Sequence, residues 1–492
     1  MCKNKFIKKI MLSVISAMFS LSVVSCSFDL SNLSSISLDS DTATETVYEK
    51  VKDIDILPAI TDVSNENLPD DDTTADDEET AEVVEEIIVE PETPPEPEEF
   101  FVCIGDPETT KYKEISSNDY YANISGIPIT DLDSFKLEIA KLPHLVYLDM
   151  CNCGLTNEQM EELIDEFPMT KFVWMISMTS TNEARTLVWK CRTDALAFST
   201  LHGYATDPRM TNPDGQQLKY CKDLVALDLG HNAVYDIEFL KDNPNIHILI
   251  MVDAYNRDRH CKFDDLSILE NEPNLMYLEF FVGGITDLSF LQYNKEMVDL
   301  NISYNPISDS TYLYDLPKIE RLYMESTYIP YSEFEKLKEV YPDAQLEYYG
   351  SGSIDHGWRS HPRYFAMIDM YRNNYWNDLF RTEEELADAA TYDLLQLGKK
   401  RYWGTSTIAP APTVEEIAGY IQDTLPHDQL PADNQQCNFD GFGHPYSTDD
   451  GTGAIRVYMS DGQYHWFYSN EVLARRLRYM KDEGGLDEFL NK

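Results

Sequence analysis

The strongest pattern along the chain is a repeated spacing of apolar residues. From residue 224 onward, aliphatic residues recur in the order L-x-x-L-x-L-x-x-N/C-x-L, first as Leu224, Leu227, Leu229, Asn232 and Val234. Further units start at 246, 275, 297 and 319, so the spacings are 22, 29, 22 and 22 residues, and an earlier unit starts at 145. Self-similarity at such a period indicates stacked structural units, each of which buries its apolar face only against its neighbours.

A second apolar element follows in each unit. It reads Asp-Ile-Glu-Phe-Leu at 236–240 and returns at 265–269 and 287–291, with a weaker copy at 309–313. A longer match joins residues 154–174 to 328–348, and within it 157–167 and 331–341 have helical spacing. We expect helices at these two ranges on the outer face, and short strands with alternate residues facing the core elsewhere.

This pattern resembles the leucine-rich-repeat family, and its 22-residue units resemble the subtype of bacterial surface proteins. The resemblance covers about 145–175 and 224–350, and it implies a solenoid with short parallel strands on its concave face. The Asn at the ninth place is expected to hydrogen-bond turn backbone in neighbouring coils. Ala254, Gly283 and Thr327 replace this Asn. Residues 176–222 lack the motif and are either an insertion or degenerate coils.

The strand residues between the motif positions are expected to face the concave side, where a leucine-rich-repeat protein would meet a ligand. Apolar members of two neighbouring units should form one patch with polar flanks, which is typical of a binding site. The alternative is that residues 176–222 or the C-terminal region pack over this patch. The candidate ligand-binding residues are Ile248, Ile250, Tyr277, Glu279, Phe281, Asp299, Asn301, Arg321 and Tyr323.

The 29-residue unit contains an insertion between residues 254 and 265. Its basic residues Arg257, Arg259 and Lys262 stand out on an acidic chain and are a second candidate site, for an acidic ligand or glycan. A solvated loop without function is the alternative interpretation.

The N-terminus carries the features of an export signal. Four lysines among the first nine residues precede an apolar stretch over residues 10–24, which is short for a membrane span and favours a signal-peptide core. The stretch ends in Val-Val-Ser-Cys at 23–26 and resembles a bacterial lipobox. The resemblance implies a signal peptide over residues 1–25 and lipid attachment at Cys26, on the extracellular face of the cell membrane. An ordinary signal peptide with a chance Cys is the alternative.

Residues 26–110 are predicted to be the lipid anchor and a disordered linker. Residues 53–110 hold 21 acidic residues and no Lys or Arg, and such a segment cannot bury enough apolar surface to offset its ordering entropy. The whole chain has 87 acidic residues, 39 Lys or Arg and a net charge of −48. This balance argues against nucleic acid as a partner, because phosphate binding needs clustered basic residues.

The remaining 142 residues are not repeats. Residues 351–400 are rich in aromatic residues and Arg, and we predict that they cap the open end of the solenoid at 111–350. Residues 405–492 are predicted to be a small α+β domain. A helix is expected to start at Thr413, and a hairpin is expected over 455–468 with its turn at Asp461-Gly462. The predicted fold class is therefore α/β, a leucine-rich-repeat solenoid followed by a small α+β domain.

The sequence favours a non-enzymatic binding protein at the bacterial cell surface, held to the membrane by a lipid and recognising a protein or a glycan. We predict no metal, cofactor or catalytic residues, since no G-x-S-x-G, H-E-x-x-H, P-loop or dinucleotide motif occurs. Two alternatives remain. One is a structural envelope protein. The other is an enzyme within 351–492, where Cys437 with His444 is the one candidate nucleophile and base.

Overall fold

The computed structural model describes residues 99–179, 186–190, 195–197, 210–252, 263, 265–350, 355–373, 375–449, 451–469, 471 and 473–474. The predicted lipid-attachment residue Cys26 and the basic loop with Arg257, Arg259 and Lys262 lie outside these residues. In the described part, no helix has the length and apolar run needed to cross a membrane.

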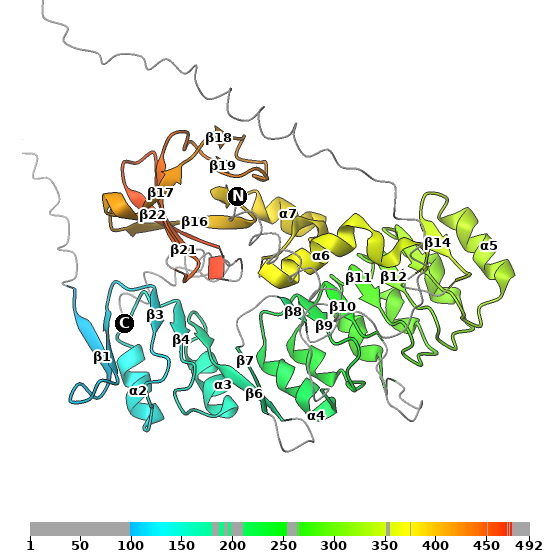
Figure 1. The fold of residues 1–492 in the computed structure, drawn as a ribbon, viewed down its shortest axis with the longest axis horizontal. Coiled ribbons are helices and arrows are strands. Elements are labelled where there is room, and N and C mark those ends of the chain that lie inside the picture. Colours follow the sequence, from blue (N-terminus) through cyan, green and yellow to red (C-terminus); the bar gives the residue numbers. More distant parts are fainter. Residues whose placement is uncertain are drawn as a thin grey trace, which may run out of the picture. The chain divides into compact units, whose positions relative to one another are not determined.

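The described chain opens with a hairpin and three coils (Figure 1). Strands β1 (Phe101–Gly105) and β2 (Tyr112–Ser116) pair antiparallel and bury Val102, Ile104 and Ile115. Strand β1 therefore lies within residues 26–110, which the sequence assigns to the anchor and linker. Strands β3 (Tyr121–Asn123), β4 (Tyr147–Asp149) and β5 (Lys171–Val173) then pair in parallel, separated by helices α2 (Leu132–Ile139) and α3 (Asn157–Glu166).

The motif-poor segment combines both predicted alternatives. An antiparallel hairpin of β6 (Met175–Thr179) and β7 (Thr186–Lys190) interrupts the array as an insertion. The next strand, β8 (Ala195–Ala197), pairs in parallel with β9 and so belongs to a degenerate coil. Its outer elements are α4 (Asn212–Gly215) and a 3-10 helix over Gln216–Tyr220.

The predicted repeats form one seven-stranded parallel sheet in the order β14-β13-β12-β11-β10-β9-β8. Each strand places its central Leu opposite the central Leu of the next, so that Leu227, Leu249, Leu278 and Leu300 form one buried row. This register confirms the apolar period of the sequence. The strands after β8 are β9 (Ala226–Asp228), β10 (Ile248–Ile250), β11 (Tyr277–Glu279), β12 (Asp299–Asn301), β13 (Arg321–Tyr323) and β14 (Gln345–Glu347).

The second apolar element of each repeat forms the outer layer. It is a 3-10 helix in four coils, whereas the predicted helices at 157–167 and 331–341 are α3 and α5 (Tyr331–Val340). A capping box between Thr156 and Gln159 starts α3. The four 3-10 helices are Glu238–Asp242, Ser267–Asn271, Ser289–Gln292 and Thr311–Tyr314.

Asparagine side chains connect the coils, as the repeat motif predicts. Asn305 Nδ2 donates to Phe280 O at 2.7 Å, and its Oδ1 accepts from Gly283 N at 2.9 Å in the preceding coil. Asn232 Oδ1 accepts in the same way from Met210 N at 3.0 Å. These bonds satisfy buried backbone groups at turns where no sheet partner is present.

A second row of side chains makes similar bonds at the end of the outer layer. Asn294 Nδ2 donates to Leu269 O at 2.9 Å. In the coil before it, Glu272 holds the equivalent position and accepts from Ile246 N at 3.2 Å through Oε2. The side chain is buried, and this burial raises the pKa of Glu272 to about 8. The carboxyl is therefore protonated in the folded chain at neutral pH and ionised in the unfolded chain.

We expect the free energy of unfolding to fall as the pH rises from about 4.5 to about 8, because Glu272 then ionises. A carboxyl with a raised folded pKa contributes its full stability below about pH 4.5 and loses it up to about pH 8. Glu272→Gln replaces the ionisable carboxyl with a neutral amide and should make the chain about 2–3 kcal/mol more stable at pH 8. The pKa shift sets an upper bound of roughly 5 kcal/mol, and the gain is smaller because water relaxes around the ionised carboxylate of the wild type. Thermal unfolding at pH 5 and pH 8 measures the difference. An equal pH slope in variant and wild type would contradict the assignment.

The chain after the array covers the concave side instead of the open end. The 3-10 helix η7 (Asp355–Ser360) and helix α6 (Pro362–Asn373) lie along the strands of the array (Figure 1), and their apolar side chains form one core with Ile248, Ile250 and Tyr277. Two short helices follow, η8 (Asp378–Phe380) and α7 (Glu383–Ala389). Among the described residues no strand pairs with the outer edge of β14.

The C-terminal region is a sheet of eight strands in the order β17-β20-β21-β22-β16-β15-β19-β18. It begins at residue 394, ahead of the predicted boundary at 405. Its aromatic side chains also reach the first coils, where the Tyr121 and Tyr468 rings are 5.3 Å apart. The strands are β15 (Leu394–Leu397), β16 (Lys400–Ala409), β17 (Ile417–Tyr420), β18 (Asp423–Thr424), β19 (Gln436–Cys437), β20 (Pro445–Ser447), β21 (Ala454–Tyr458) and β22 (Tyr464–Tyr468).

Two local predictions in this region had different outcomes. The hairpin is confirmed, because β21 and β22 pair antiparallel and Gly462 in the turn has a φ of +83°. The helix predicted at Thr413 is wrong. Thr413 and Glu416 do form a capping box, but it closes a single 3-10 turn (Val414–Glu416), and the chain then enters β17. Pairing of β17 with β20 overrides the local helix signal.

Candidate ligand-binding site

The structure places the predicted concave-face residues side by side, and it buries nearly all of them. Tyr277, Asp299 and Arg321 stand in one row across three strands, and Glu279, Asn301 and Tyr323 stand in the next. Phe281 alone is partly exposed. The other eight side chains are buried, including Ile248 and Ile250.

Trp358 is the centre of the segment that covers this face. Its indole is fully buried between the Tyr277 and Tyr323 rings, with centroids 5.4 and 4.8 Å away. The Arg321 guanidinium lies 4.4 Å from the indole centroid, and its Nη1 donates to Trp358 O at 3.0 Å. Two aromatic contacts and a cation–π contact thus hold the Trp358 side chain on the concave strands.

Ion pairs fix the same segment at both ends of the contact. Arg359 Nη2 donates to Glu279 Oε1 at 2.8 Å, and Arg363 Nη1 donates to Asp299 Oδ1 at 2.8 Å. Asp299 Oδ1 also accepts from Arg321 Nε at 2.8 Å. The buried acids of the concave face therefore have intramolecular partners, and of the two alternatives drawn from the sequence, packing by the C-terminal region is the one observed.

The candidate nucleophile of the enzyme alternative is not activated. Cys437 is fully buried and its Sγ contacts Phe439 O at 3.2 Å, and burial raises the pKa of the thiol to about 11. His444 Nδ1 is instead 2.9 Å from Tyr458 O. A nucleophilic Cys needs a lowered pKa and a base within hydrogen-bond reach, so this pair lacks both requirements. Across the described residues, no group of three His, Cys, Asp or Glu side chains could hold a metal ion.

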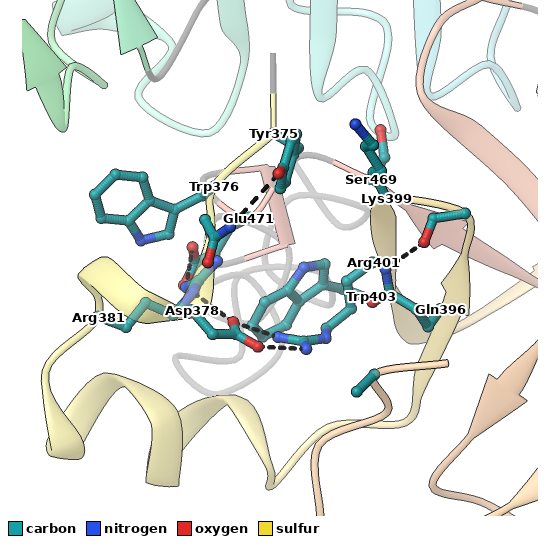
Figure 2. A pocket seen from close by; sticks show the side chains of 13 residues that line it. Tyr375, Trp376, Asp378, Arg381, Gln396, Lys399, Arg401, Trp403, Ser469 and Glu471 are labelled. Carbon is teal, nitrogen blue, oxygen red and sulfur yellow. Dashed lines mark hydrogen bonds and ion pairs between the residues drawn. The ribbon is translucent and has the colours of Figure 1, made fainter. Parts of the chain in front are cut away.

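A cavity of about 340 Å³ lies where the covering segment joins the C-terminal sheet (Figure 2). It is walled by residues just after α6, by the β15–β16 hairpin and by the end of β22. The volume is at the small end of the range for small-molecule sites. Its lining residues are Tyr375, Trp376, Asn377, Asp378, Arg381, Gln396, Gly398, Lys399, Arg401, Trp403, Ala432, Ser469 and Glu471.

The charged side chains of the cavity are paired with one another (Figure 2). Arg401 binds Asp378 through both terminal nitrogens, at 2.8 and 2.7 Å. Arg381 pairs with Asp378 at 3.1 Å and with Glu471. Although burial opposes ionisation of Asp378, these guanidinium groups hold the pKa of its carboxyl below the ordinary value. At the rim, Lys399 pairs with Asp369 at 2.5 Å.

A buried histidine joins this cavity to the array. His247, directly before β10, places Nδ1 2.7 Å from Asn245 O and Nε2 2.8 Å from Glu385 Oε2. Its ring also meets the edge of Trp376 with centroids 5.1 Å apart. Glu385 in turn caps its own helix, accepting from Thr382 N at 2.9 Å. The wall residue Trp376 is therefore positioned by the solenoid as well as by the C-terminal region.

The sequence does not predict this cavity, because its walls come from four separate segments. The aromatic and Arg content of 351–400 is evident in the sequence, but by itself it predicts a cap and no cavity. A cluster of Tyr375, Trp376 and Trp403 near charged residues is the signal that could have pointed to a site.

Comparison with known proteins finds leucine-rich-repeat proteins among the solved structures, at low sequence identity. The sequence matches no protein-family model and no curated protein. Among solved structures, one internalin of Listeria monocytogenes shares 22% identity over 31% of this chain and 69% of that chain, with a TM-score of 0.24. A second Listeria monocytogenes internalin shares 18% over 46% and 68%, with a TM-score of 0.25. A leucine-rich-repeat protein of Leptospira interrogans shares 13% over 48% and 55%, with a TM-score of 0.26.

These neighbours are leucine-rich-repeat proteins, and the overlaps are too partial to carry an argument about function. The leucine-rich-repeat architecture of this chain is defined by its own features. These are the 22-residue period, the parallel register of the central leucines and the Asn bonds between coils.

Proposed function

We propose that this chain is a surface-anchored, non-enzymatic binding protein that recognises a protein or a glycan outside the cell. One observation carries the proposal: a cavity lined by aromatic and paired polar side chains lies where the segment that covers the array joins the C-terminal sheet. Ligand sites are usually concave and combine aromatic side chains with fixed polar groups, and this cavity has both. In this proposal the repeats are the scaffold and the C-terminal region carries the recognition.

The location follows from the N-terminal sequence. A lipid on Cys26 would hold the chain at the membrane, and the acidic linker would extend outward. Fully stretched, the 72 residues from 27 to 98 would reach roughly 240 Å at ~3.3 Å each. The membrane is a partner through the lipid alone in this account, and nucleic acid is no partner of a chain with a net charge of −48.

Recognition by the concave residues would require the covering segments to move away from the strands. Tyr277, Glu279 and Asp299 could meet an external ligand only after η7 and α6 left the strands, because these segments bury them. The basic loop with Arg257, Arg259 and Lys262 stays a separate prediction.

A binding screen tests the proposed function. The full chain is immobilised and titrated with arrays of purified glycans and of purified surface proteins. We expect saturable binding to at least one of them. Absence of binding across both arrays would contradict a recognition function and would favour the structural envelope role.

A further inference from the structure

The charge pattern of the Figure 2 cavity decides what kind of ligand it fits. Each ionised side chain that lines it has a partner of opposite charge: Asp378 with Arg401, Arg381 with Glu471, and Lys399 with Asp369. Lys399 is exposed, but beside the buried Arg381 and Arg401 a charged ligand would have to break an ion pair and leave a desolvated charge behind, which costs more than it gains. The cavity is therefore matched to a ligand without net charge.

The same cavity keeps hydrogen-bonding capacity for a polar ligand. Arg401 Nε is buried and has no hydrogen-bond partner among the described residues. Each paired carboxylate still has free lone pairs, because the two oxygens together offer about four acceptor sites. Asn377 Oδ1 accepts from Leu379 N and Gln396 Nε2 donates to Gly398 O, and the remaining polar groups of these two side chains, with Ser469, add small neutral donors and acceptors. A ligand that donates and accepts at adjacent atoms would use these planar groups well.

Aromatic side chains supply the apolar part. Trp376 is half-buried and lines the cavity together with Tyr375 and the buried Trp403. Arg381 lies 5.9 Å from the centroids of both indoles, so it is fixed against these rings by cation–π contacts as well as by its ion pairs. Rings held in this way offer an ordered apolar surface beside the hydrogen-bonding groups.

We propose that this cavity binds one or two units of a neutral saccharide, the C–H face of the sugar against Trp376 and its hydroxyls on the planar polar groups. A sugar hydroxyl is donor and acceptor at once, and neighbouring hydroxyls fit bidentate side chains. The proposal rests on the proposed function, of which it selects the glycan branch.

Titration of the full chain with cellobiose, maltotriose and chitobiose tests the assignment, by calorimetry and by Trp fluorescence. At least one of the three should bind at a single site. Trp376→Ala should weaken that binding about tenfold or more, which equals the loss of roughly one good contact. Phe442→Ala, an exposed aromatic of the same domain outside the cavity lining, is the matched control and should leave binding unchanged.

Because Trp376 also packs on His247, Gln396→Ala is a second variant that changes the cavity from the sheet side. Circular dichroism establishes that each variant is folded. A loss of affinity in both variants supports the site. Failure of all three saccharides to bind, or binding only of glucuronate or inorganic phosphate, would overturn the neutral-saccharide assignment. A protein ligand found in the array screen would still leave the proposed binding function standing.

Discussion

Trp358→Ala is expected to destabilise the chain by about 3–5 kcal/mol, the cost typical of removing a fully buried Trp. The substitution leaves a cavity between Tyr277 and Tyr323 and removes the cation–π contact of Arg321. It also exposes apolar strand residues of the concave face. Chemical unfolding followed by circular dichroism measures the loss, which should be accompanied by faster hydrogen exchange in β11 to β13.

The matched control is Phe365→Ala, in the next helix, α6, where the side chain is 57% exposed. It should change stability by less than about 1 kcal/mol. A loss that is equally small for Trp358→Ala would mean that η7 does not occupy the concave face in solution.

Asp299→Ala is expected to cost a similar amount, about 3–5 kcal/mol, for a different reason. Asp299 is fully buried and accepts from both Arg321 and Arg363 at 2.8 Å. Removing one member of a buried ion pair leaves an uncompensated charge in a desolvated place. The change should also loosen α6, because Arg363 then keeps only its contact with the exposed Glu320.

A double variant separates charge from packing. Asp299→Ala combined with Arg321→Leu removes both buried charges, so its cost should be at least about 2 kcal/mol smaller than the sum of the two single costs. Asp309→Ala is the surface control, since the Asp309 side chain caps an exposed turn through Thr311 N. Additive costs of the two single variants would show that Asp299 and Arg321 are not coupled.

The repeat array was predictable because its signal is periodic and local. The spacing of Leu227, Leu249, Leu278 and Leu300 sets the strand register, and the helical spacing of 157–167 and 331–341 sets α3 and α5. The covering of the concave face was not predictable. The aromatic residues of 355–373 indicate that this segment is buried, but their spacing does not show which surface it packs against.

The contacts that hold this segment on the concave face join residues that are far apart in the sequence. Arg359 and Glu279 are 80 positions apart, and Arg363 and Asp299 are 64 apart. Either Arg read alone is an ordinary surface residue. The Figure 2 cavity was not predictable for the same reason, because Asp378, Arg401 and Glu471 come from three segments and lie together only in the folded chain.

Hydroxyl-radical footprinting of the full chain tests the central claim most directly, namely that the chain fills its own concave face and leaves recognition to the cavity beside it. Tyr277, Tyr323 and Trp358 should be protected, whereas Tyr328 and Tyr349, which are 71% and 67% exposed on the last coil, should be modified rapidly. Modification of Tyr277 and Tyr323 at the rate of Tyr328 would contradict the account, because it would show an open concave face available to a ligand.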